Sequence, residues 1–131
     1  MKQVLTIILR SLVALFMIFA GVQHFMKPDF YLPFVSSFLP FQMSIVYLSG
    51  VVEIVLGLGL LLHKKYARYA ALGLFLMMVL FLPIHLRDVF SATPAIGSHS
   101  AALIRLPIQF IFIVVSWLIY AVLSRQIKNQ N

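Results

Sequence analysis

The sequence predicts an all-α membrane protein, folded as a bundle of four transmembrane helices. Hydrophobic residues make up 63% of its 131 residues and charged residues only 10%, a composition far from that of soluble globular proteins. Four apolar runs lie at about residues 4–25, 43–62, 67–86 and 101–123. Each supplies the roughly 20 helical residues that cross a hydrocarbon core of about 30 Å. The runs lack the strict alternation of barrel strands, so helices are favoured.

The first run resembles a secretory signal at first sight, because Lys2 precedes an apolar stretch that ends near Gly21. Arg10 interrupts that stretch, and Ile18 fits the small-residue cleavage pattern poorly. We therefore expect a retained first helix, in which Arg10 extends toward the lipid headgroups. The length leaves room for one domain, residues 1–131.

The connection between the first two runs is rich in prolines and aromatic residues. Pro28, Pro33 and Pro40 forbid a long regular helix there. Aromatic rings accumulate at the headgroup boundary. The sequence therefore predicts a short cap at the membrane surface, which serves either as an anchoring belt or as a lid over a pocket between the helices.

The basic residues predict how the bundle is oriented. Six of the ten lie at the N-terminus, the second connection or the C-terminus, which share one side of a four-span protein: Lys2, Lys64, Lys65, Arg68, Arg125 and Lys128. By the positive-inside rule we expect both termini to be cytoplasmic, in a bacterial cytoplasmic membrane. Topology then accounts for the net charge of +7, and no nucleic acid is expected as a partner.

Glu53 is the one acid inside an apolar run. A carboxylate at the bilayer centre costs about 2.5–3.5 kcal/mol, so it usually faces protein or trapped water and has a partner. Gly50 and Gly57 lie at i−3 and i+4 on its helical face, and small residues mark close helix packing in membranes. We expect Glu53 to face the bundle interior near the midplane.

The other three spans offer polar groups to the same half of the membrane: His24, His85, and Arg105 with Gln109. Arg105 and Gln109 share one helical face, and Arg105 is the expected partner of Glu53. The five polar side chains form either a functional polar pocket in the outer half of the bundle or a structural network that fixes helix register.

Pro107 leaves two alternatives for the fourth helix. It kinks a helix that begins near Ala101, or it occupies the first turn of a helix that begins near Leu106. The second alternative would move Arg105 to the rim of the bundle.

Metal binding is not expected from this set. Two histidines and a carboxylate are a plausible ligand set, but no two of them lie at i and i+4, and a nearby arginine would repel a cation. The chain has no cysteine, and neither a Gly-rich phosphate loop nor a recognisable nucleophile motif is present. The sequence thus contains no self-contained catalytic motif, and it leaves open whether the protein is an enzyme.

From about Leu15 to Leu123 the chain resembles the DoxX-like family of small four-helix membrane proteins. The resemblance rests on three motifs: Ala20-Gly21-x-x-His24-Phe25-x-x-Pro28-x-x-Tyr31, Leu48-Ser49-Gly50-x-x-Glu53-x-x-Leu56-Gly57, and Arg105-Leu106-Pro107-x-Gln109. The third helix departs from the pattern, because Pro83 stands before the Ile84-His85 pair where an asparagine is expected.

The resemblance implies two functions of different classes. Relatives include a membrane subunit associated with thiosulfate and quinone oxidation, partners in oxidative-stress complexes, proteins linked to quinone resistance and a receptor chaperone. We therefore expect a small subunit or accessory of a quinone-linked redox system, with no intrinsic cofactor and with a quinone or other lipophilic ligand in its pocket. Its electrons would come from a redox partner.

The alternative is a non-enzymatic chaperone or assembly factor that binds a client membrane protein. A proton-coupled carrier is disfavoured, because one four-helix protomer leaves little room for alternating access unless it dimerises. The sequence leaves a homo-oligomer open.

Overall fold

Four long helices and two short ones make up the described part of the chain. The computed structural model describes residues 3–130, which contain α1 (Gln3–Met26), α2 (Pro28–Tyr31), the 3-10 helix η1 (Leu32–Phe34), α3 (Gln42–Leu61), α4 (Lys64–Phe90) and α5 (His99–Lys128), with no strand among them. The four long helices are each long and apolar enough to cross a membrane. The predicted all-α four-helix bundle is confirmed.

Local sequence accounts for the helix ends. α1 ends before Lys27, whose backbone is not helical, because a residue that precedes a proline disfavours the helical conformation. The ring Nδ1 of His63 accepts a hydrogen bond from the backbone N–H of Lys65 at the start of α4, and the Ser98 hydroxyl accepts one from Ala101 at the start of α5. These caps satisfy N–H groups that the first turn of a helix leaves without partners.

The structure shows where α5, the helix that contains Pro107, begins. α5 begins at His99 and runs through Pro107 without a break, so Arg105 lies in its second turn rather than at a helix start. α4 likewise continues through Pro83. Both prolines are tolerated inside helices that pack against each other.

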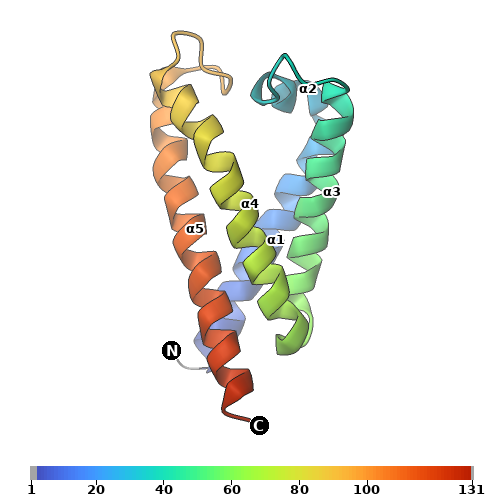
Figure 1. Cartoon of the computed structure of the whole chain (residues 1–131), viewed down its shortest axis with the longest axis vertical. Helices are drawn as coiled ribbons and strands as arrows, with labels where there is room; N and C mark the ends of the chain where they lie inside the picture. The colour runs from blue at the N-terminus through green and yellow to red at the C-terminus, as the bar shows by residue number, and fades with distance from the viewer. Residues whose placement is uncertain (1–2, 131) are drawn as a thin grey trace.

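The helices pack as two pairs. α1 packs along α3, and α4 packs along α5, while α1 and α5 have little contact. Figure 1 shows the two pairs close together at the end that holds both termini and the α3–α4 turn, which we call the terminal end. They diverge toward the opposite end, the loop end, which carries α2, η1 and residues 91–98.

The apolar core lies toward the terminal end. Its buried side chains come from all four long helices: Val13, Ala14, Met17, Leu60, Ala67, Ala70, Ala71, Leu74, Met77, Met78, Ile119 and Leu123. Many large apolar side chains remain on the outside of the helices. A membrane protein presents such an exterior to lipid, and the exposed apolar side chains therefore indicate a lipid environment.

Candidate functional site

A cavity of about 460 Å³ lies between the two helix pairs near the loop end. Its boundary toward the terminal end is apolar and is formed by Phe16, Met17, Met78 and Phe112. The rings of Phe16 and Phe112 lie 4.8 Å apart and join α1 to α5 at this boundary. All five polar residues singled out from the sequence, His24, Glu53, His85, Arg105 and Gln109, line the cavity.

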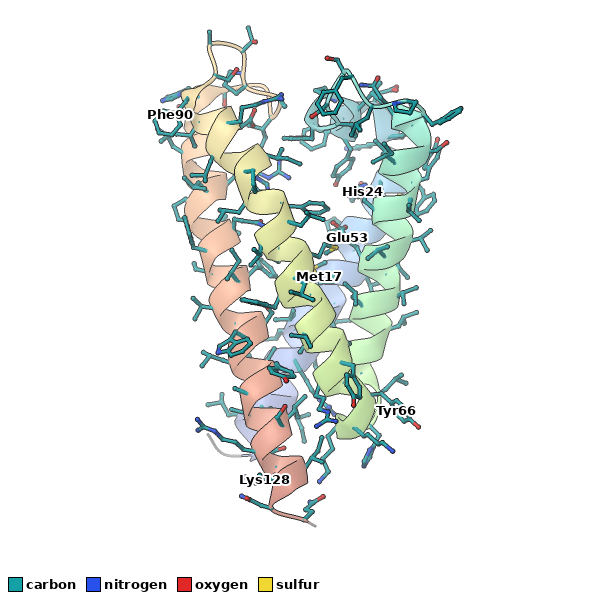
Figure 2. The ribbon with its side chains drawn as sticks, in the orientation of Figure 1. Met17, His24, Glu53, Tyr66, Phe90 and Lys128 are labelled. Carbon is teal, nitrogen blue, oxygen red and sulfur yellow. The ribbon has the colours of Figure 1, made fainter. Side chains whose placement is uncertain are left out.

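His24 and Glu53 lie side by side at the wall made by α1 and α3. The Nε2 atom of His24 lies 3.5 Å from the Oε2 atom of Glu53, and both residues are 7% exposed. Figure 2 shows the two side chains between the helix pairs, with Met17 on their terminal-end side. Glu53 Oε2 has no hydrogen-bond partner, and the His24 imidazole is the polar group that lies beside it.

The other ring nitrogen of His24 defines the tautomer. Nδ1 lies 3.0 Å from the carbonyl oxygen of Val46 and 3.1 Å from the Ser49 hydroxyl, which itself donates to the same carbonyl. A carbonyl oxygen can only accept, so Nδ1 carries a proton. Nε2 then faces the Glu53 carboxyl group, with 3.5 Å between Nε2 and Oε2.

This pairing differs from the one expected from the sequence. Arg105 was the expected partner of Glu53, and the structure has no ion pair between them; the carboxylate pairs with His24 instead. The reason is geometric. α3 packs along α1, whereas Arg105 lies on α5 in the other helix pair.

Glycines allow the close approach that brings His24 to Glu53. A Cβ atom added at Gly50 would lie 2.7 Å from His24 Cβ and 2.8 Å from Gly21 O, and one added at Gly57 would lie 2.9 Å from Ala14 O. Real Cβ atoms essentially never come this close. Gly50 and Gly57 therefore lie at the α1–α3 contact, and Gly21 supplies the facing surface on α1.

The opposite wall carries Arg105, Gln109 and His85. The Gln109 amide Nε2 donates to the carbonyl oxygen of Met78 at 2.7 Å, which ties α5 to α4. The Arg105 Nη1 and the His85 Nδ1 are buried without hydrogen-bond partners. Unpaired buried polar atoms are costly, so these two groups are available to a ligand in the cavity.

Two aromatic residues of the α2–η1 segment cover the cavity at the loop end. The Tyr31 ring stacks on His24 with 3.7 Å between centroids, and Arg105 Cζ lies 4.3 Å from the centroid of the Phe34 ring. The segment thus touches a charged or protonatable group on each helix pair. We call residues 30–34 the lid, since they cover the cavity from outside the membrane-spanning helices.

The Tyr31 phenol responds to the charges of the cavity. Its pKa lies above the ordinary value of 10.0, first because burial disfavours the phenolate and second because the Glu53 carboxylate repels it; Arg105 acts in the opposite direction. Tyr31 is therefore a neutral hydrogen-bond donor at pH 7.

Ser49, Tyr31 and Phe34 complete the site, although the sequence did not single them out as site residues. The sequence contains an indication for each of them. Ser49 lies one helical turn before Glu53, and Tyr31 and Phe34 lie in the proline-rich cap that was expected to act either as an anchoring belt or as a lid. Within residues 3–130, no group of three or more His, Cys, Asp or Glu side chains lies close enough to hold a metal ion.

Comparison with known proteins places the chain in a family whose function is unknown. The sequence profile described as "Domain of unknown function (DUF8561)" matches residues 13–120, and the chain belongs to this family. The matched range includes every residue that lines the cavity. No curated protein and no solved structure shows significant similarity to the chain.

Proposed function

We propose that this member of the DUF8561 family holds a quinone-like amphipathic molecule in the loop-end cavity and serves as an accessory subunit of a membrane redox system. The observation that supports this proposal most strongly is the buried His24–Glu53 pair on one wall of an otherwise largely apolar cavity. The volume of about 460 Å³ lies within the range of about 300–1,000 Å³ that is typical of small-molecule sites.

The distribution of polar groups supports a flat ligand with oxygens on two sides. His24 and Glu53 lie on the α1–α3 wall, and Arg105 lies on the α4–α5 wall. A para-quinone carries its two carbonyl oxygens at opposite positions of one ring. Aromatic side chains of the cavity lining, among them Phe16, Phe81 and Phe112, provide apolar faces for that ring.

His24 and Glu53 are both side chains that can carry a proton, and this gives the pair its chemical role. Reduction of a quinone to a quinol takes up two electrons and two protons. The electrons come from a partner redox protein. The pair delivers one proton to the ring oxygen that it contacts, and water at the aqueous side of the lid supplies the second proton to the other ring oxygen. The pair then regains a proton from the aqueous side of the lid. Arg105 hydrogen-bonds the second oxygen through Nη1, which has no partner within the protein.

We also propose that the chain is related to the DoxX-like family and that the bundle has a defined orientation in the membrane. The described basic residues at the terminal end, Lys64, Lys65, Arg68, Arg125 and Lys128, favour a cytoplasmic terminal end in a bacterial cytoplasmic membrane. The cavity and its lid then face the outer leaflet.

Gentle purification from native membranes tests the proposal. Mass spectrometry of bound lipophiles and of co-purifying proteins should recover a quinone and a redox protein with the wild-type chain. Glu53→Gln should reduce the quinone signal while the protein still accumulates. Asp29→Asn is the matched control, because this exposed acid of α2 lies outside the cavity lining. Recovery of neither a quinone nor a redox partner with the wild-type chain would contradict the proposal.

A chaperone or assembly factor is the second candidate, favoured by exposed aromatic residues at the loop end. Phe38 is 82% exposed, Phe41 81% and Phe90 85%. Such rings can anchor at the headgroups or bind a client helix. If the alternative holds, client membrane proteins co-purify, and replacing these three phenylalanines with serine releases them while Glu53→Gln does not.

A further inference from the structure

The terminal end contains a second, smaller cavity whose polar lining is basic. It measures about 210 Å³ and is lined by residues of α1, the α3–α4 turn, α4 and α5. Arg10, His63 and Lys64 supply the basic groups, and Gln3 and Gln126 supply amides. Nothing in the proposed redox function uses this cavity.

No acid balances these cations. The three acidic residues of the chain are Asp29, Glu53 and Asp88, all of them described, and none lines this cavity. Asp29 and Asp88 lie at the loop end, and Glu53 pairs with His24. Among the described residues, the cavity therefore gathers basic side chains without an acidic one.

Arg10 is the group that most needs a partner. Its Nη1 atom is buried and has no hydrogen bond. Arg10 lies seven residues after Gln3 on α1, which is about 10 Å along the helix axis at 1.5 Å per residue. A guanidinium at that depth of a membrane-spanning helix is costly unless it pairs with another group or reaches the headgroup region.

The donor set matches a phosphate group. The Arg10 guanidinium has a planar fork that fits phosphate oxygens in a bidentate manner. The Lys64 ammonium uses one donor on Gln130 Oε1 and retains two others. His63 accepts at Nδ1 from Lys65 N, which leaves Nε2 to carry the proton of the neutral ring. Donors from several elements thus converge on a space large enough for one tetrahedral anion.

We propose that this basic cavity binds a phosphate group, as carried by the headgroup of an anionic lipid or by free inorganic phosphate. The site is independent of the loop-end cavity, because the two share no lining residue. Phosphate binding here neutralises Arg10 and joins α1 to the start of α4 and the end of α5. The terminal end is thereby held closed by its ligand.

Native mass spectrometry of the full chain in an uncharged detergent tests the lipid source. The wild-type chain should retain added dioleoylphosphatidylglycerol in preference to dioleoylphosphatidylcholine. Arg10→Gln should weaken that retention about tenfold, because it removes a charge-assisted hydrogen bond. Arg125→Gln is the matched control, since Arg125 belongs to the same end of the protein but does not line the cavity. It should behave as wild type.

A second arm tests free phosphate. In lipid-free detergent, inorganic phosphate should raise the unfolding temperature of the wild-type chain more than that of Arg10→Gln if free phosphate is the ligand, and should have no such effect if a lipid is. Lys64→Gln, at the start of α4, repeats both arms in case Arg10→Gln fails to fold. Equal lipid retention and equal phosphate response in wild type and in the folded variants would overturn the proposal.

Discussion

The Nε2 atom of His24 lies 3.5 Å from the Oε2 atom of Glu53, and this pair connects α1 to α3 at the wall of the loop-end cavity. Because Nδ1 of the same ring is held by the Val46 carbonyl, the ring is fixed in orientation and directs Nε2 at the carboxylate. A proton between two such groups can move to a third acceptor beside them. The pair is therefore suited to exchange a proton with a bound molecule.

The ionisation of Tyr31 should report the charges of the cavity. Glu53 raises the pKa of the phenol and Arg105 lowers it, so Glu53→Gln should lower the pH at which Tyr31 ionises and Arg105→Gln should raise it. The absorbance of tyrosinate near 295 nm measures this titration. Subtracting the titration of Tyr31→Phe removes the other four tyrosines. Identical Tyr31 curves in both variants and wild type would mean that the phenol lies away from these charges.

The same shift has a consequence for stability at high pH. The Tyr31 pKa is higher in the folded protein than its ordinary value of 10.0, so the protonated phenol stabilises the fold below pH 10. This contribution is lost as the pH rises through the folded-state pKa. Tyr31→Phe should therefore lose less stability than wild type between neutral pH and strongly alkaline pH, as measured by thermal unfolding in detergent.

Lid contacts should control how long a ligand stays in the cavity. The stacking of Tyr31 on His24 is of a kind worth about 0.5–1.5 kcal/mol beyond buried area. Tyr31→Ala should thus speed quinone dissociation by roughly 2- to 10-fold, as measured by stopped-flow displacement. Phe38→Ala is the control, because Phe38 follows the lid but is 82% exposed. Equal dissociation rates in Tyr31→Ala and wild type would show that the stacking of Tyr31 on His24 does not retain the ligand.

Packing of α1 on α3 should depend on Gly50. In Gly50→Ala the new Cβ would meet backbone and a constrained Cβ on α1 at 2.7–2.8 Å, and overpacking of this kind costs about 1–3 kcal/mol. Gly73→Ala is the control, since its Cβ would meet only the end of the Leu56 side chain, which can move. Thermal unfolding should show a clear loss for Gly50→Ala and little for Gly73→Ala. The reverse order would contradict the packing described.

The loop between α4 and α5 should depend on Asp88. Its carboxylate is buried and accepts from the backbone N–H groups of Ala95 and Ile96 at 2.5 and 3.2 Å. Asp88→Asn weakens one bond and replaces the other acceptor with a donor, at a cost of about 1–3 kcal/mol. Hydrogen exchange of residues 91–98 should quicken. Asp29→Asn, at an exposed acid, should leave exchange in this loop unchanged.

The sequence predicted the helices well because membranes impose a simple rule. A span needs about 20 apolar residues, and the four runs found this way differ from the observed helices mainly at the polar ends. Those ends were missed because polar residues continue the helices: α5 begins at His99, capped by Ser98, before the apolar run begins, and α4 continues through Arg87 and Asp88 to Phe90.

It was harder to predict which side chains pair within the site than which residues belong to it. Helical spacing placed Glu53 and the two glycines on one face, and that part follows from the 3.6-residue period alone. Which helix meets that face depends on how the pairs assemble. Because α3 lies against α1, the partner of Glu53 is His24, and Arg105 stacks on Phe34 of the lid instead.

Equilibrium binding of a short-tailed para-quinone to the purified chain tests the central claim most directly. Wild type should bind it, and Glu53→Gln should bind it about 10- to 100-fold more weakly, since hydrogen bonds to charged groups contribute about 1.5–3 kcal/mol. Asp29→Asn should bind as wild type. Equal affinity of Glu53→Gln and wild type, with both folded, would show that the His24–Glu53 pair holds helices together and binds no ligand.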